Sequence, residues 1–530
     1  MTTLHDRTTR AAAALESLTT RLGSTLAGRS VDEQQPEALV LARALALNAA
    51  AGSMVRWGAA GGDHERAMAA HFVALAVAEV GRAAWLPMGD SALDPDTRAF
   101  ANERLGTAAA SALGRAILAR DMDPAGALGL DPMHQMVRKE FARFSDAEIA
   151  PVAEAIHRHD ALIPERLIRA MAGLGVFGIS IPEEWGGNFA DHRTMIIATE
   201  ELSRGSLGAG GSVITRPEIC AKAILKGGTA EQKARWLPAL ASGDRLISVA
   251  VTEPDAGSDV ARVKLAARRV SGGYVLSGEK TWCTFAGRAD VLCVLARTGS
   301  LEDGHKGLTL FLVEKSPITS DDGDDKVFEY VQPGNGGSGR LAGKAIPTIG
   351  YRGMHSFSVS FDDVFVPDDC RIGAEGQGFY LQMAGFAGGR IQTAARAVGV
   401  MEAAFREALR YSRDRKVFGK ALADLPLTQV KLAEMAARLQ AGRQLSYEVG
   451  DAMDGGKGDF EASLVKFMTC KDAEWVTREA MQLHGGMGYS EEYPVSRLWQ
   501  DARVLSIFEG AEEVLGLFVI ARGYLARSAQ

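Results

Sequence analysis

Cysteine is scarce in this chain of 530 residues. The five cysteines are scattered, odd in number, and none forms a CxxC pair. Structural zinc sites use closely spaced cysteines, and disulfide frameworks use an even number of them. The pattern argues against both and is typical of a reduced, cytoplasmic protein without a metal site. The cysteines are Cys220, Cys283, Cys293, Cys370 and Cys470.

An excess of positive charge is also missing. The net charge is −7 and no basic stripe is present, which argues against a nucleic-acid surface. The N-terminus lacks the charged segment and following apolar segment of a secretory signal. The longest apolar stretches near the N-terminus are broken by charged residues, so we expect buried helices too short to span a membrane. The interrupting residues are Arg43, Arg56, Glu79 and Arg82.

Apolar residues, by contrast, make up 47% of the chain, enough for several cores. They recur with a helical period near both ends of the chain and through residues 134–243. In the middle, short alternating apolar runs separated by Gly and Asp predict an antiparallel β-domain, a barrel or a sandwich. The predicted fold is therefore mainly α with a central antiparallel β-domain.

These changes of period predict four domains. Within the first, we expect helices at 11–22, 37–57, 64–85 and 96–119, which form a packing or oligomerisation domain. A linker is expected at 121–132, and an Asp- and Gly-rich surface insertion at 320–343. A capping-box pattern also predicts a helix beginning after Thr229, with Gln232 as the reciprocal partner. The domains are an N-terminal helical extension at 1–125, a helical domain at 131–245, a β-domain at 246–373 and a C-terminal helical bundle at 376–530.

The most informative stretch is Ile507-Phe508-Glu509-Gly510, close to the C-terminus. A carboxyl group set in apolar surroundings has its charged form disfavoured. Such a group can take a proton from carbon if the resulting negative charge is stabilised elsewhere. Alone, the tetrapeptide is more typical of an ordinary helix or turn, so its meaning depends on the motifs around it.

Two blocks of motifs accompany Glu509. The first is VAVTEPDAGSD at 249–259 with GEKTWCT at 278–284, and the second is RDRKVFGK at 413–420 with QLHGGMGY at 482–489. Together they resemble the acyl-CoA dehydrogenase family, in its order and about its spacing. The resemblance runs from about residue 132 to the C-terminus. It implies a helical, β-barrel, helical fold carrying an extra N-terminal helical domain, and oxidation of an acyl-CoA with FAD.

The resemblance assigns the flavin ring to the β-domain motifs. Thr252, Gly257, Ser258, Trp282 and Thr284 match positions around the ring. Thr284 would lie at the N5 edge, and Ser258 would also approach the CoA thioester. Read without the family, Ser258 and Thr284 could instead satisfy the backbone of turns.

The helical motifs match positions at the far end of FAD. Arg415 and Phe418 match residues on the same FAD, with Arg415 at the pyrophosphate, where a planar guanidinium suits phosphate. Gln482 and Gly486 match residues that contact the adenosine end across a subunit boundary, which implies a homo-oligomer, a dimer or tetramer. Alone, Arg415 could equally be an exposed helix-end residue, and the glycine cluster is only weak evidence for nucleotide binding.

By the same resemblance, Glu509 removes the α-proton while a hydride leaves the β-carbon for flavin N5. The family polarises the thioester carbonyl with the backbone amide of the base, in the segment that includes Gly510. Some relatives carry the base before an arginine of an earlier helix, but here that position is Gly389. The following residue, Arg390, matches an arginine that shapes the active site, although it could simply lie on a helix face.

The substrate class follows from weaker signals. Arg216 falls where the family lines its acyl pocket and could pair with a carboxylate of the acyl chain, or could face solvent at a helix start. The N-terminal extension, residues 320–343 and residues 350–357 are similar to family members that act on a branched dicarboxylic acyl-CoA. Electrons would pass to an electron-transferring flavoprotein. The alternatives are an acyl-CoA oxidase, a dehydrogenase of another short branched acyl-CoA, and an inactive CoA-binding scaffold.

Overall fold

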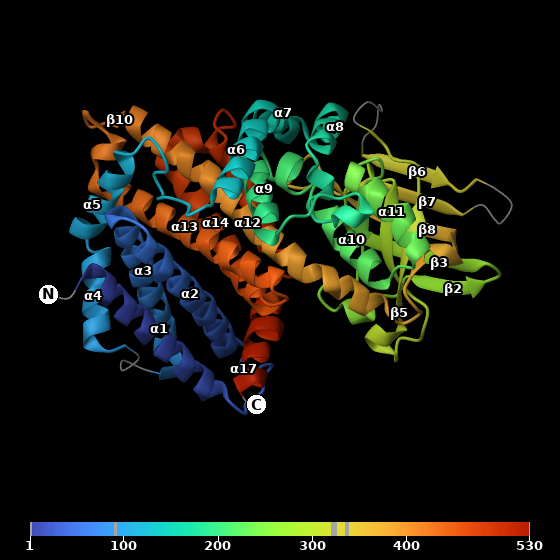
Figure 1. The fold of residues 1–530 in the computed structure, drawn as a ribbon, viewed down its shortest axis with the longest axis horizontal. Helices are drawn as coiled ribbons and strands as arrows, with labels where there is room; N and C mark the ends of the chain where they lie inside the picture. Colours follow the sequence, from blue (N-terminus) through green and yellow to red (C-terminus); the bar gives the residue numbers. More distant parts are fainter. Residues whose placement is uncertain (1–2, 89–92, 320–325, 334–338, 529–530) are drawn as a thin grey trace. The chain divides into compact units, whose positions relative to one another are not determined.

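The computed structural model describes residues 3–88, 93–319, 326–333 and 339–528. Its contacts divide the chain into two compact units, shown in Figure 1. One unit joins residues 1–140 to residues 393–530, and the other comprises residues 141–392. Helical segments before and after a central β-sheet confirm the predicted fold class.

The first unit is helical, apart from one two-stranded hairpin in its described part. The expected helix at 96–119 is in fact two helices, because Gly106 adopts an extended backbone between them. The N-terminal helices are α1 (Leu4–Leu26), α2 (Gln35–Ala60), α3 (Asp63–Met88), α4 (Pro95–Leu105), α5 (Thr107–Leu118) and α6 (Pro132–Phe144). The C-terminal elements are α12 (Gly378–Asp414), β10 (Lys416–Val417), β11 (Lys420–Ala421), α13 (Pro426–Asp454), α14 (Asp459–His484), α15 (Val495–Leu505), α16 (Glu512–Val514) and α17 (Arg522–Ser528). Residues 378–392 of α12 belong to the second unit and the rest of this helix to the first.

The N-terminal helices pack directly on the C-terminal helices within this unit. Helix α5 crosses α13 so closely that a Cβ at Gly114 would lie 2.2 Å from the carbonyl oxygen of Gln429. The expected linker is also packed rather than free. The indole of Trp57 donates to the carbonyl of Ala127 at 2.8 Å, and Leu128 is buried. Tertiary contacts, which turn-forming composition does not report, hold this segment in place.

Helices α2 and α3 are longer than the sequence pattern indicated. Residues 35–60 and 63–84 are each long and apolar enough to cross a membrane, so the expectation that they are too short was wrong. Most of each apolar window is nevertheless buried in the unit, 56% and 61% respectively. The expectation of buried helices is therefore confirmed, since a core helix meets the same length criterion.

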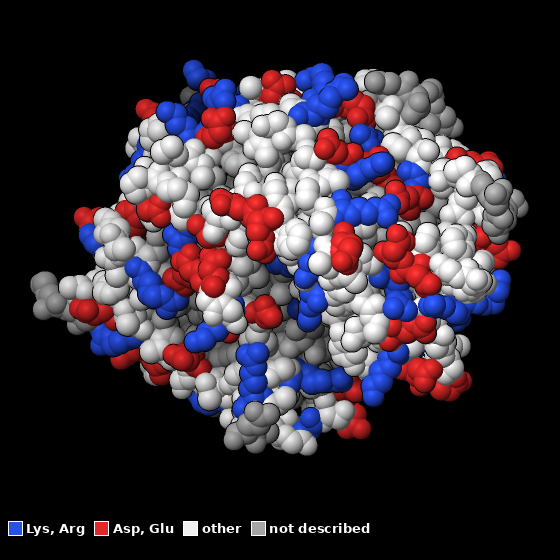
Figure 2. All heavy atoms as spheres, turned by 45° about the vertical axis from the view of Figure 1, so that its right-hand side comes forward, with Lys and Arg blue, Asp and Glu red and all other residues white. Residues whose placement is uncertain are grey.

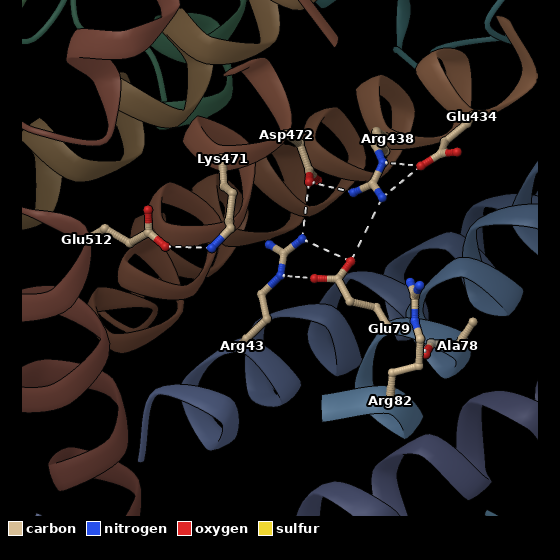
Figure 3. Close-up of polar contacts among 9 residues, drawn as sticks. All are labelled: Arg43, Ala78, Glu79, Arg82, Glu434, Arg438, Lys471, Asp472 and Glu512. Atoms are coloured by element: carbon tan, nitrogen blue, oxygen red, sulfur yellow. Dashed lines mark hydrogen bonds and ion pairs between the residues drawn. The ribbon is translucent and has the colours of Figure 1, made fainter. Parts of the chain in front are cut away.

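Two of the charged residues that interrupt the apolar helices, Arg43 and Glu79, join a buried network (Figure 3). Arg43 of α2 pairs with Glu79 of α3 at 2.7 Å and with Asp472 of α14 at 3.2 Å. Asp472 also accepts from Arg438 of α13 at 2.8 Å, and Arg438 pairs with Glu434. Asp472 is only 1% exposed, so each charge here depends on its partners. The network ties four helices together across the sequence.

Helix α3 also buries His71, which is 3% exposed. Its Nδ1 lies 3.3 Å from the carbonyl oxygen of Arg104. Because a carbonyl only accepts, Nδ1 carries the proton and Nε2 is left as an acceptor. Burial lowers the pKa of His71 to about 4, and the positive charge of Arg438 acts in the same direction. The imidazole is therefore neutral near pH 7.

The pH dependence of stability should report this burial. Between pH 6.5 and about 4 the unfolded chain binds a proton at His71 that the folded chain does not. The free energy of unfolding should therefore fall as pH falls through that window, by up to about 3 kcal/mol. His71→Asn keeps an amide donor for Arg104 but cannot titrate. In urea unfolding at several pH values, the stability gap between wild type and variant should narrow on acidification. A gap independent of pH would contradict the assignment.

The second unit holds a nine-stranded sheet with helices beside it. Most neighbouring strands are antiparallel, as predicted. Strand β1, however, pairs with β4 in parallel, and one residue pair joins β2 to β4 in parallel. The strand order is β6-β7-β8-β3-β2-β4-β5-β9. The strands are β1 (Ile247–Ala250), β2 (Ala266–Val270), β3 (Gly273–Thr284), β4 (Val291–Arg297), β5 (Leu308–Glu314), β6 (Val327–Val331), β7 (Arg340–Ala345), β8 (Ser356–Pro367) and β9 (Arg371–Ile372). The helices are α7 (Ala150–His159), α8 (Glu165–Gly173), α9 (His192–Gly205), α10 (Thr215–Gly227) and α11 (Ala230–Ser242).

Strand β4 is buried along its whole length because both faces are covered. Val291, Cys293 and Leu295 belong to the core that includes residues of α10 and α11. Leu292 and Val294 belong to the core formed among the strands themselves. This explains a continuous apolar run where a half-exposed strand would alternate.

The predicted capping box is present, and part of the expected surface insertion is a strand. Thr229 and Gln232 form the predicted capping box at the start of α11, with bonds of 3.2 and 2.9 Å. Of the expected insertion, residues 320–325 and 334–338 lie outside the described residues. Between them β6 forms an edge strand, and its Phe328 is 4% exposed. The alternating apolar residues of β6 were obscured by the Asp- and Gly-rich sequence on either side.

Charges of both signs are interspersed over the face shown in Figure 2. Several exposed residues of the protein form ion pairs, for example Arg340 with Glu329 at 2.6 Å. Exposed pairs of this type contribute little to stability. The face shown has no continuous band of basic side chains.

Candidate active site

The β-domain motifs converge at the carboxyl ends of β1 and β3. The carbonyl of Thr252, just after β1, accepts from the amide of Thr281 near the end of β3 at 2.8 Å. A tight turn follows Thr252 and leaves Gly257 and Ser258 exposed. Both residues thus lie exposed at the end of a strand, and their contact with the flavin ring stays a prediction.

Trp282 has an unusual backbone. Its φ is +55°, in the left-handed region, and the pairing of β3 with β8 shifts register between Lys280 and Cys283. A β-bulge of this kind re-aims a side chain, and a bulky residue at positive φ is strained. Trp282 is 56% exposed although it lies within a strand. The strand is therefore distorted at the point where the motif places a large aromatic side chain.

Thr284 ends the same strand and is 8% exposed. Its hydroxyl lies 2.9 Å from the hydroxyl of Ser356 on β8, and its carbonyl accepts from Ser248 of β1. The hydroxyl thus has one fixed neighbour and retains a further hydrogen-bonding direction, since a hydroxyl can both donate and accept.

An ion pair that sequence reasoning missed joins the two motifs. Lys280 on β3 is fully buried, and its Nζ lies 2.8 Å from Glu253 in the turn after β1. Glu253 also accepts from the amides of Lys264 and Leu265. Burial lowers the pKa of Lys280, and the charge of Glu253 opposes that shift. Lys280 lies among polar residues of β3, so the strand's composition gave no signal that it is buried, and a buried lysine needs a partner.

Arg415 and Phe418 lie in the first unit, between α12 and α13. Residues 416–421 form a tight hairpin whose turn residues, Phe418 and Gly419, both have positive φ. Such a turn favours glycine or asparagine, so phenylalanine there is strained. Phe418 is 98% exposed and Arg415 is exposed beside it. Two large side chains, one apolar and one cationic, thus stand at the surface of this unit.

Gln482 and Gly486 lie at the C-terminal end of α14. Both are exposed, and a Cβ at Gly486 would meet no atom within 4 Å. The ring of His484 stacks on Tyr411 of α12 at 4.1 Å, which places this end of α14 beside the end of α12. The positions predicted to contact FAD beyond its ring, including Arg415, are therefore brought to one end of the helical unit.

Glu509 lies in the loop between α15 and α16. Its φ is +55°, and Gly510 follows with φ +99°. The ammonium of Lys466 on α14 donates to the carbonyl of Gly510 at 2.6 Å. Glu509 is half-buried in this chain. A non-glycine residue held at positive φ by a lysine contact is an uncommon arrangement, typical of positions under functional constraint.

The apolar neighbours of Glu509 behave differently from each other. The guanidinium of Arg396, which is fully buried on α12, lies 4.7 Å from the centre of the Phe508 ring. Ile507 is 53% exposed, so it does not pack around the carboxylate as the sequence suggested. The loop is thus anchored by Phe508 and by the Gly510 carbonyl, on either side of Glu509.

The two arginines predicted to meet substrate belong to the second unit. Arg216 is 6% exposed in the first turn of α10, so a solvent-facing helix start is wrong for it. Arg390 is half-buried on α12. Gly388 of α12 lies against Glu218 of α10, since a Cβ there would meet the carboxylate oxygen at 1.9 Å. Helices α10 and α12 therefore lie in contact where they carry these arginines.

Three family models match this chain in sequence. They are the N-terminal domain of acyl-CoA dehydrogenase at residues 131–244, the middle domain at 248–364 and the C-terminal domain at 376–525. The chain is also 43% identical over 402 residues to (2S)-methylsuccinyl-CoA dehydrogenase from Cereibacter sphaeroides, covering 76% of this chain and 71% of that protein.

The chain belongs to the acyl-CoA dehydrogenase family. It is an acyl-CoA dehydrogenase: its three matched domains follow one another in the family's order, and its fold is that of the family. Residues 1–130 precede the first matched domain.

Solved structures of acyl-CoA dehydrogenases are similar to this one. The glutaryl-CoA dehydrogenase complex with glutaryl-CoA aligns with a TM-score of 0.68 at 29% identity, covering 75% of this chain and 96% of that one. A Mycobacterium smegmatis glutaryl-CoA dehydrogenase in complex with FADH2 aligns with a TM-score of 0.65 at 26% identity, covering 76% and 96%. Within the described residues, no group of three or more His, Cys, Asp or Glu could hold a metal ion in this dehydrogenase.

Proposed function

We propose that this acyl-CoA dehydrogenase oxidises (2S)-methylsuccinyl-CoA, a short branched dicarboxylic acyl-CoA, to mesaconyl-CoA with FAD. The similarity to an enzyme of that name supports the substrate. The placement of Glu509, at positive φ in a loop anchored on both sides, is the observation that carries the chemistry. The pathway around such a substrate would be the ethylmalonyl-CoA pathway, in the cytoplasm.

The residues present suit FAD in both units. Exposed Gly257 and Ser258, the re-aimed Trp282 and the hydroxyl of Thr284 offer an edge of small donors and an aromatic face. Thr252 positions its loop through the bond to Thr281. A flavin held there would supply the oxidant for removal of the hydride from the substrate β-carbon.

The other four positions suit the phosphates and the adenosine. Arg415 supplies a guanidinium for the pyrophosphate. Gly486 leaves its backbone open to close approach, with Gln482 beside it. Phe418, 98% exposed, would be covered by FAD or a second copy of the chain. The exposure of Phe418 leads us to propose a homo-oligomer. As the electron acceptor we propose an electron-transferring flavoprotein.

Glu509 acts as the base in this proposal. The Glu509 carboxylate takes the proton from the α-carbon of the thioester, and the C–H electron pair becomes part of the new α,β double bond. The backbone amide of Glu509 polarises the thioester carbonyl, and Gly510 lets the loop turn directly after it. Lys466 holds the loop through the Gly510 carbonyl.

Arg216 is proposed to pair with the free carboxylate of the substrate. Arg216→Gln should lower kcat/KM for methylsuccinyl-CoA by about 10-fold or more, because a charge-assisted bond in a buried site is lost. A branched acyl-CoA of equal length that ends in a methyl group should be much less affected. Arg216→Lys keeps the charge and should restore part of the loss. Equal losses for both substrates would assign Arg216 a structural role only.

A panel of acyl-CoA substrates tests the function as a whole. The purified protein should be yellow, and its flavin absorbance should bleach under anaerobic conditions with methylsuccinyl-CoA more efficiently than with short linear acyl-CoAs. Turnover with and without oxygen separates a dehydrogenase from an oxidase. A colourless protein that binds CoA esters without bleaching would overturn the proposal in favour of a scaffold.

A further inference from the structure

A cavity of about 460 Å³, open to solvent on one side, lies among α3, the end of α4 and α5, within the N-terminal helices. Small side chains line part of it, and two of them, Ala112 and Ala116, are exposed. Leu113 completes the apolar lining and is 6% exposed. The alanines of the lining are Ala67, Ala109, Ala112 and Ala116. The cavity lies before residue 131, outside the segments that match the family's domains.

The polar lining of the cavity is incompletely satisfied. The Nε2 atom of His71 and the Nε atoms of Arg104 and Arg120 are buried without a hydrogen-bond partner in the described part of the chain. Such atoms are costly unless a further group meets them. Because His71 Nδ1 donates to the Arg104 carbonyl, Nε2 requires a donor, whereas each arginine requires an acceptor.

The charge of the lining is positive. Arg120 forms no ion pair with any described carboxylate, whereas Arg104 pairs with Glu103. The acidic lining residue, Asp63, has a fully exposed side chain that pairs with Arg66 at 2.8 Å. An anion that enters the cavity therefore meets an uncompensated guanidinium.

Arg120 is also held in place. The guanidinium of Arg413 donates to the backbone carbonyl of Arg120 at 3.0 Å and to the backbone carbonyl of Leu118 at 2.8 Å. These contacts fix the end of α5 against α12. The remaining polar residue of the lining is His64. Its Nε2 atom lies 3.0 Å from the carbonyl oxygen of Pro124, within hydrogen-bond distance.

We propose that this cavity binds a small organic anion, with a carboxylate or phosphate group between Arg104 and Arg120. A donor on the same molecule meets Nε2 of His71, and an apolar body packs on the alanines. Guanidinium groups bind such oxyanions strongly, because they donate two parallel hydrogen bonds. This site is independent of the acyl-CoA chemistry proposed above.

Isothermal titration of the full-length protein with inorganic phosphate, butyl phosphate and pentanoate tests the proposal. Butyl phosphate or pentanoate should bind more tightly than inorganic phosphate, because an apolar body adds buried area. The better of the two identifies the preferred anion. Arg120→Gln should weaken that binding by about 10-fold or more. Ala112→Leu should abolish it by filling the cavity while keeping a good helix former.

Arg29→Gln is the matched control, since Arg29 is exposed in the same helical extension, outside the cavity lining. It should leave binding unchanged. Absence of binding by all three probes at millimolar concentration would overturn the proposal. So would binding that survives both Arg120→Gln and Ala112→Leu, because the anion would then lie elsewhere. A change of oligomeric state in Ala112→Leu, without anion binding in the wild type, would show that a second copy covers the cavity.

Discussion

Glu509→Gln should lower turnover of methylsuccinyl-CoA by about 10³-fold or more, because removal of a general base costs between two and four orders of magnitude. The amide is nearly the same size as the carboxyl group and cannot accept the proton. Flavin content and CoA-ester affinity should stay close to those of the wild type. Steady-state turnover, flavin absorbance and equilibrium binding of the product measure these three properties separately.

Exchange of the substrate α-proton with deuterium oxide gives a second readout. This exchange needs the base but does not need hydride transfer, so it should disappear in Glu509→Gln together with flavin bleaching. Glu513→Gln provides the matched control, because Glu513 is exposed four residues further along the chain. Its turnover should equal that of the wild type. Turnover retained in Glu509→Gln would remove Glu509 from the mechanism.

Asp472→Asn should lower the free energy of unfolding by about 3–5 kcal/mol, because it leaves buried arginines without their shared carboxylate. Asp472 is 1% exposed and serves both Arg43 and Arg438 in the network of Figure 3. Glu79 contacts both arginines and Glu434 contacts Arg438, but neither replaces a charge on α14. Urea unfolding followed by circular dichroism measures the loss.

Asp32→Asn makes the same chemical change in an exposed pair with Arg522, at 3.0 Å. Its cost should be about 1 kcal/mol or less, because exposed pairs are screened by water and salt. Similar losses of unfolding free energy in the two variants would mean that water can solvate the arginines once Asp472 is replaced. The network would then contribute little to joining the helices.

The local predictions succeeded where one short segment decides the outcome. The capping box at Thr229 and Gln232 formed as predicted, because both partners lie within one turn of helix. Short apolar runs separated by Gly and Asp likewise predicted the β-domain in which strands such as β5 lie. The motifs around Thr252, Trp282 and Arg415 indicated the family because their order and spacing are read directly from the chain.

The predictions failed or stopped short where partners are remote in sequence. The residues at 121–132 have the composition of a linker, yet Trp57 and neighbouring helices hold them. The apolar pattern of β6 was obscured by its flanking segments. For Glu509, the residues predicted a carboxylate in apolar surroundings, but the exposure of Ile507 is set by packing and not by side-chain type.

The amino-acid sequence by itself determined the periodic elements, the fold class and the family of this protein, since these depend on neighbouring residues and on motif order. Only the tertiary structure decided which charges meet. Lys280 finds Glu253 across 27 residues, and Arg43 finds Asp472 across 429. The cavity lined by Arg104 and Arg120 has the same origin. Contacts of this range depend on how helices and strands pack together, which no local pattern of side chains specifies.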